Sequence, residues 1–112
     1  DAAADCHDDL RVLLRRFHSS AYVPYIVFDL ADTLTWSWRK HKNATLAVAL
    51  YADFLRRWPD HSLAAAAIRS GAFALKDLGR QEEAVEWMER FEKEFPDRRR
   101  ELSAIRRHVL GG

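Results

Sequence analysis

The sequence is poor in the residues that interrupt or cross-link a chain. Its 112 residues include one cysteine, three prolines and four glycines. The single cysteine, Cys6, excludes an internal disulfide framework, and the scarcity of glycine and proline leaves long stretches in which helices can form. The longest largely apolar run, Ala44–Ala52, is much shorter than the about 20 residues that a membrane-spanning helix requires. We therefore expect no transmembrane segment.

The sequence also lacks a strong excess of charge and any catalytic motif. Its formal net charge of +1 argues against general attraction to nucleic acid or anionic lipid. None of the five histidines stands in an H-x-x-x-H or H-E-x-x-H spacing, and there is no phosphate-binding glycine loop. The densest group of potential ligands, residues 6–9, would point in different directions on a helix. We expect no enzyme activity, no metal, no cofactor and no nucleic-acid partner.

The most informative feature present is an internal repeat. Residues 47–60 (AVALYADFLRRWPD) resemble residues 84–97 (AVEWMERFEKEFPD), 37 positions further on. A period of this length with helical spacing is typical of helix-hairpin arrays, in which each hairpin buries its apolar face on a neighbour. Such arrays mostly bind other proteins. The matching pairs are Ala47 and Ala84, Val48 and Val85, Phe54 and Phe91, Trp58 and Phe95, Pro59 and Pro96, and Asp60 and Asp97.

Periodicity and cap residues divide the chain into six expected helices, at about 4–17, 21–37, 44–57, 62–78, 81–94 and 98–110. We expect Asn43, Asp60 or Ser62, and Asp97 to cap three of them, and Gly79 to end the fourth. The expected fold class is all-α, with antiparallel hairpins in a single domain over residues 1–112. Its core is expected to include Val27, Leu30, Ala31 and Leu34 of the second helix and Leu102, Ile105, Val109 and Leu110 of the sixth.

These residues resemble the tetratricopeptide repeat (TPR) family. The resemblance rests on Ala72, Gly79, Glu83-Ala84, Met88 and Pro96 in one unit, and on Ala31, Ala47, Tyr51 and Pro59 in the unit before it. The chain departs from the family at Phe54 and Phe91, where a small alanine is usual, and in its period of 37, where the family has about 34. In both departures it is similar to the bacterial outer-membrane assembly lipoproteins and the Tol-Pal-associated periplasmic proteins.

The resemblance implies a right-handed TPR-like α-solenoid of about six helices that acts as a non-catalytic protein-binding scaffold. It also implies a periplasmic or cell-envelope location, with the cytoplasm as the alternative. If the helices at 44–57 and 81–94 are the second helices of their hairpins, the helix at 4–17 lacks its first helix and the helix at 98–110 lacks its second. These two helices are therefore half-repeats. Either the chain is a fragment of a longer array, or its ends pair with another chain as a homo-oligomer, or the arginine-rich helix at 98–110 serves as a polar cap.

In the TPR fold the first helices of successive hairpins line a concave groove, here the helices at 21–37, 62–78 and 98–110. The resemblance thus implies a groove that binds a peptide or helix of a partner protein. Aromatic residues among charged ones are typical of binding hot spots. The candidates, on faces turned away from the core stripes, are Tyr25, Phe28, Asp32, Trp36, Arg69, Phe73, Lys76 and Arg106.

Several features of this face remain open. Phe28 and Phe73 either anchor a partner or pack between adjacent helices. We place Ser70 beside Phe73 on the same outward face. Arg69 and Arg106 form a hypothetical clamp for a C-terminal carboxylate, because guanidinium pairs with carboxylate through two hydrogen bonds.

The turn at residues 36–42 provides a second expected contact surface, since it interleaves aromatic and basic residues. Its members are Trp38, Arg39, Lys40 and Lys42. Two alternatives to the scaffold hypothesis also remain. The chain is a structural domain that assembles with itself through its open ends, or it is a regulatory or targeting domain of a larger enzyme.

Overall fold

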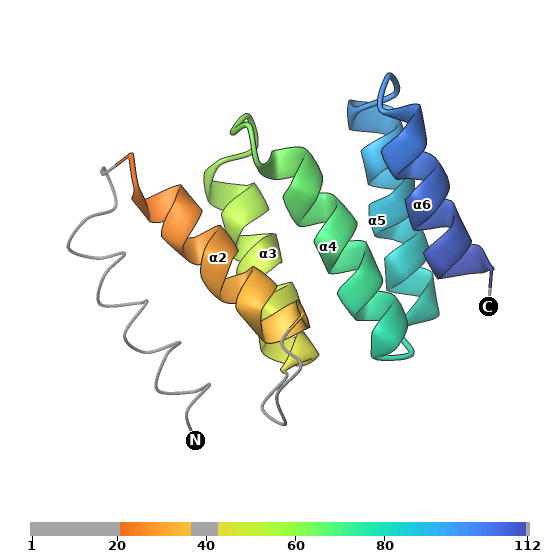
Figure 1. Cartoon of the computed structure of the whole chain (residues 1–112), viewed down its shortest axis with the longest axis horizontal. Coiled ribbons are helices and arrows are strands. Elements are labelled where there is room, and N and C mark those ends of the chain that lie inside the picture. Colours follow the sequence, from red (N-terminus) through yellow and green to blue (C-terminus); the bar gives the residue numbers. More distant parts are fainter. Residues whose placement is uncertain (1–20, 37–42, 112) are drawn as a thin grey trace.

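A computed structural model of the chain describes residues 21–36 and 43–111, which form five helices (Figure 1). They are α2 (Val23–Trp36), α3 (Ala44–Arg57), α4 (Ala64–Asp77), α5 (Gln81–Glu94) and α6 (Arg99–Leu110). These two ranges contain no strand, which confirms the all-α fold class for them. No helix within them is both long and apolar enough to cross a membrane. The helix expected at 4–17 lies outside the described residues.

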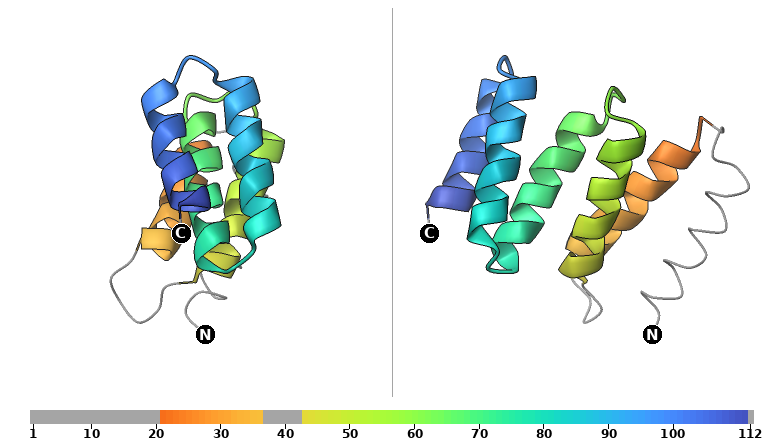
Figure 2. Two further views of the ribbon diagram at one scale, coloured as in Figure 1. Left: turned by 90° about the vertical axis from the view of Figure 1, so that its right-hand side faces the viewer. Right: turned by 180° about the vertical axis from the view of Figure 1, so that it is seen from behind.

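Consecutive helices run antiparallel and pack in chain order (Figure 1). α3 packs on α2 and α4, and α5 packs on α4 and α6. α4 also touches both α2 and α6, so α2, α4 and α6 lie in one layer, with α3 and α5 in a second (Figure 2, left). α4 contacts each of the other four helices and is therefore the most enclosed of them.

The sequence repeat is also a repeat of packing. Phe54 in α3 and Phe91 in α5 are fully buried at matching positions. Each ring packs on the aromatic residue four positions later, with ring centroids 5.3 Å apart for Phe54–Trp58 and 5.6 Å apart for Phe91–Phe95. Both helices end in the same way, because the backbone N–H of the second aromatic residue donates to the carbonyl of the phenylalanine at 2.8 Å.

Contact between α4 and α5 depends on Gly71. The Trp87 ring of α5 lies against the α4 backbone at Gly71, so that a Cβ atom at this position would overlap the ring. Gly71 is surrounded on α4 by buried small residues, among them Ala67, Ala72 and Ala74. Their small volume allows the indole to approach the helix axis, where it is partly buried against the core.

Two expected helix ends are confirmed. Asn43 caps α3, with its Oδ1 accepting a hydrogen bond from the Leu46 N–H at 3.0 Å. Gly79 follows the last turn of α4 with a φ of 78°, in the left-handed region that a residue with a Cβ adopts only at a cost.

The caps expected from Asp60, Ser62 and Asp97 are wrong. α4 and α6 begin without a side-chain cap. Ahead of α4, the Leu63 N–H donates to Nδ1 of His61 at 3.0 Å. The acceptor of this N–H is thus the His61 imidazole, and not the expected carboxylate of Asp60 or hydroxyl of Ser62.

Most of the expected apolar stripes are confirmed. Leu102, Ile105 and Val109 of α6 are buried, whereas Leu110 is 56% exposed. Its expected place in the core is wrong because Leu110 lies about 100° further round the helix than Val109. In α2, Leu30 is only partly buried, and the other three expected core residues are buried.

Candidate partner-binding surface

α4 is accessible along one stripe only. Every residue of α4 outside this stripe is buried, including Ser70 and Gly71. The remaining positions follow helical spacing and so lie on one side of the helix. We call these five residues the α4 stripe: Ala66, Arg69, Phe73, Lys76 and Asp77.

Three of the expected site residues lie on the α4 stripe, and Ser70 does not. Arg69, Phe73 and Lys76 are each partly exposed. Ser70 is only 1% exposed, so its expected place on the outward face is wrong. Ser70 lies about 100° from Arg69 around α4, which turns it inward toward α3.

α6 flanks the α4 stripe with two residues that the sequence analysis did not select. Glu101 Oε2 accepts a hydrogen bond from Arg69 Nη1 at 3.3 Å. The His108 ring packs on Phe73 with a centroid distance of 4.5 Å, and its Nε2 lies 3.2 Å from Oδ1 of Asp77. Glu101 and His108 are seven positions apart and therefore share a face of α6. The spacing alone shows that the two residues share a face, but it does not show that this face of α6 packs beside α4.

On the other side of the stripe, α2 presents Tyr25. Its side chain is exposed, and its ring lies edge-on to His61 with a centroid distance of 4.9 Å. Trp36 is the last residue of α2, but its side chain lies outside what the structure describes, so its expected place in the groove stays a prediction. The whole expected second contact surface, Trp38, Arg39, Lys40 and Lys42, lies outside the described residues.

Phe28 packs between helices, as its alternative interpretation held. The ring is partly buried and lies edge-on to Tyr51 and Phe54 of α3, with centroid distances of 6.0 and 6.2 Å. Phe28 therefore takes part in packing between α2 and α3, and its role as a partner anchor stays a prediction. Around the axis of α2, position 28 lies about 60° nearer to the buried stripe than position 25 does. Tyr25 therefore stays outside, while Phe28 packs against the core.

Asp32 belongs to a polar network between α2 and α3. Tyr51 Oη donates to Asp32 Oδ1 at 2.9 Å, and Thr35 Oγ1, which donates to the Ala31 carbonyl at 2.9 Å, lies 3.3 Å from the same phenolic oxygen. Burial raises the pKa of the Tyr51 phenol above its ordinary value, and the negative charge of Asp32 acts in the same direction. Ser70 Oγ is buried near this network and has no hydrogen-bond partner among the described residues.

The raised pKa of Tyr51 predicts a loss of stability in alkali. Below pH 10, the ordinary pKa of the phenol, folded and unfolded chains both hold the proton. Above it the unfolded chain releases the proton and the folded chain keeps it, so the unfolding free energy falls by up to about 1.4 kcal/mol per pH unit. Urea titrations from about pH 8 to about pH 11 should show this slope, and Tyr51→Phe should reduce it. Tyr22→Phe, at an exposed tyrosine, is the matched control. An equal slope in Tyr51→Phe would contradict the prediction.

Arg106 does not share a face with Arg69. Its Nη2 donates to Glu92 Oε1 of α5 at 2.8 Å, whereas Arg69 pairs with Glu101. Positions 101 and 106 lie about 140° apart around α6. The expected clamp of one carboxylate by Arg69 and Arg106 is therefore wrong, and Arg106 belongs to the α5 side of the molecule.

Lys76 completes the polar part of the stripe. Its Nζ donates to Oε1 of Gln81, the first residue of α5, at 2.9 Å. The stripe thus offers one partly exposed aromatic ring between a guanidinium and an ammonium group.

No cluster of three metal-ligating side chains occurs in the ranges 21–36 and 43–111. No protein-family model, curated protein or solved structure matches the chain.

Proposed function

We propose that the chain is a non-catalytic protein-interaction scaffold that binds a peptide or helix of a partner protein along α2, α4 and α6. One observation carries the proposal. The helix at the centre of the packing, α4, is accessible only through a stripe that holds an aromatic ring among charged side chains. An aromatic ring surrounded by polar side chains is the arrangement found at binding hot spots.

The TPR-like solenoid and its envelope location are part of this proposal. The packing of each helix on its chain neighbours, the two layers, and the repeated Phe54 and Phe91 packing support a solenoid of hairpins. The location in the periplasm or cell envelope rests on the resemblance of the sequence, and the cytoplasm is the alternative.

We assign different roles to the candidate residues. Phe73 and Tyr25 are the aromatic anchors, and Arg69 and Lys76 select the charge of the partner. Binding would move the His108 ring away from Phe73, and the polar contacts that Arg69 and Lys76 now make would be exchanged for contacts with the partner. Because these contacts are partly exposed, exchanging them requires little desolvation.

Photo-crosslinking tests the proposed surface. A benzophenone amino acid replaces Ala66 of the α4 stripe, and in a control protein it replaces Ala49, which is exposed on α3. We expect the probe at position 66, and not the probe at position 49, to capture one partner peptide in extracts of the native host. Capture at both positions, at neither, or only of a second copy of the chain would contradict the proposal.

Phe73→Ala should weaken binding of the captured peptide by about 1–3 kcal/mol, or roughly 5- to 150-fold. The ring is only partly buried, so the helical circular dichroism should be retained. Leu110→Ala, which removes an exposed apolar side chain elsewhere on the molecule, is the control and should leave binding unchanged. Calorimetry with the purified peptide measures both. Equal binding by wild type and Phe73→Ala would remove Phe73 from the site.

A further inference from the structure

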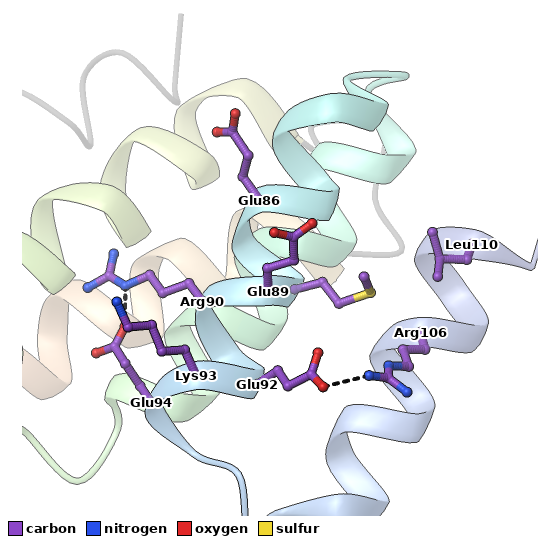
Figure 3. A pocket seen from close by; sticks show the side chains of 9 residues that line it. Glu86, Glu89, Arg90, Glu92, Lys93, Glu94, Arg106 and Leu110 are labelled. Carbon is purple, nitrogen blue, oxygen red and sulfur yellow. Dashed lines mark hydrogen bonds and ion pairs between the residues drawn. The ribbon is translucent and has the colours of Figure 1, made fainter.

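A groove runs between α5 and α6, on the side of these helices turned away from α3 and α4 (Figure 3). Its volume is about 1010 Å³, at the upper limit of the about 300–1,000 Å³ typical of small-molecule pockets. Its walls are mostly charged, which suits a protein surface better than a small ligand. We call it the end groove. It is lined by Glu86, Met88, Glu89, Arg90, Glu92, Lys93, Glu94, Arg106 and Leu110.

The two walls of the end groove have opposite charge, and part of that charge is unpaired. Arg106 pairs with Glu92 across the groove at 2.8 Å (Figure 3), and Arg90 pairs with Glu94 along α5. Among the residues that the structure describes, most charged side chains of α5 without a hydrogen bond or ion pair are acidic, and all those of α6 are basic. They are Glu82, Glu86, Glu89 and Lys93 on α5, of which the last three line the end groove, and Arg99, Arg100 and Arg107 on α6.

An acidic wall beside a basic wall is complementary to itself. A two-fold axis parallel to the helices would place α5 of one copy over α6 of the other, twice, and would bring each acidic wall onto a basic one. A two-fold axis across the helices would instead put α5 on α5 and α6 on α6, where like charges repel. Closed two-fold pairing of one patch with itself is the commonest form of assembly in homo-oligomers.

The register of the hairpin supports the same pairing. Glu86 lies ten residues before Pro96, and Arg107 lies ten residues after Asp97, so both stand at about the same height along the hairpin. A two-fold axis parallel to the helices preserves this height and places Glu86 of one copy opposite Arg107 of the other. The buried Met88 at the base of the groove and the exposed Leu110 at its rim supply the apolar contact, and methionine adapts readily to an incoming side chain.

We propose that the end groove is a homodimer interface in which α5 of each copy packs on α6 of the other. This proposal is independent of the partner-binding surface: the dimer uses the outer face of α5 and α6, and the α4 stripe stays outside it. Both interfaces can therefore be occupied in one molecule. Since the interface is largely charged, we expect association to be micromolar or weaker and to weaken as salt screens the charges.

Charge-swapped variants test the dimer. In one variant Glu86→Lys and Glu89→Lys make the α5 wall basic, and in the other Arg100→Glu and Arg107→Glu make the α6 wall acidic. Each variant alone would oppose walls of like charge in a homodimer. An equimolar mixture would restore opposite charges in both halves of a heterodimer: the swapped α5 wall of one variant faces the swapped α6 wall of the other, and the two unchanged walls face each other.

Sedimentation equilibrium measures the outcome. We expect wild type to approach twice its 13.0 kDa mass as concentration rises, each variant alone to associate at least about tenfold more weakly, and the mixture to recover association. The control variant carries Asp29→Lys in α2 and Asp60→Lys after α3, both at exposed sites, and changes the net charge as much as the α5 variant does. It should associate like wild type. A monomeric wild type, unchanged association in the swapped variants, or no recovery in the mixture would overturn the proposal.

Discussion

Phe91→Ala is expected to lower the free energy of unfolding by about 3–5 kcal/mol. Phe91 is fully buried, and truncating a buried phenylalanine loses its transfer free energy and leaves a cavity in the surrounding core. Domains of this size have a total stability of about 5–15 kcal/mol, so this one change should remove a large part of it. Phe54→Ala, at the equivalent position of the other repeat, is expected to have an effect of the same size.

Urea denaturation followed by circular dichroism measures this loss. Phe95→Ala is the control, because Phe95 packs on Phe91 but is only partly buried, and it should destabilise the protein less. Phe91→Leu should recover most of the loss, since it fills most of the volume. If Phe91→Ala were as stable as Phe95→Ala, the ring would not have the central packing role assigned to it.

Gly71→Ala is expected to destabilise the protein even though alanine is the better helix former. At an ordinary helix position the exchange would gain up to about 1 kcal/mol. Here the new methyl group would overlap the Trp87 ring, and forced repacking of a core contact costs about 1–3 kcal/mol or more. Gly71→Val adds two further carbons at the same place and should prevent stable folding.

A double-mutant cycle, measured by urea denaturation, isolates the contact between these residues. Trp87→Leu removes the ring that the methyl group would overlap, so Gly71→Ala should become neutral or stabilising in that background. Ser70→Ala, at the neighbouring buried position, introduces the same residue without the ring contact and should change stability little. If Gly71→Ala had the same effect with the tryptophan present and with it replaced, the ring would not be the source of the cost.

Helix positions were largely predictable from sequence because the signals that set them are local. Asn43 and the start of α3, and Gly79 and the end of α4, depend on hydrogen bonds and backbone angles within a few residues. The start of α4 was not predicted in detail. Asp60 and Ser62 are intrinsically better caps than His61, but the turn places the imidazole, and not their oxygens, at the Leu63 N–H.

The candidate site was predictable only as far as helical periodicity reaches. Spacing placed Arg69, Phe73 and Lys76 together, and the structure does so as well. Spacing does not tell from which direction a neighbouring helix approaches. For that reason the sequence left open whether Phe28 anchors a partner or packs on α3, where its ring lies, and it placed Arg106 on the α4 side although Arg106 pairs with α5.

The packing of each helix on its neighbours in the chain also affects how the fold is reached. The connections at 78–80 and 95–98 are short, so closing each hairpin requires little loss of loop entropy. No packed pair of described helices brings together distant ends of the chain; the furthest, α2 with α4 and α4 with α6, are next but one in sequence. Proteins dominated by such local contacts fold quickly, in microseconds to milliseconds. Each hairpin can therefore form on a growing chain before the helices that follow it have been synthesised.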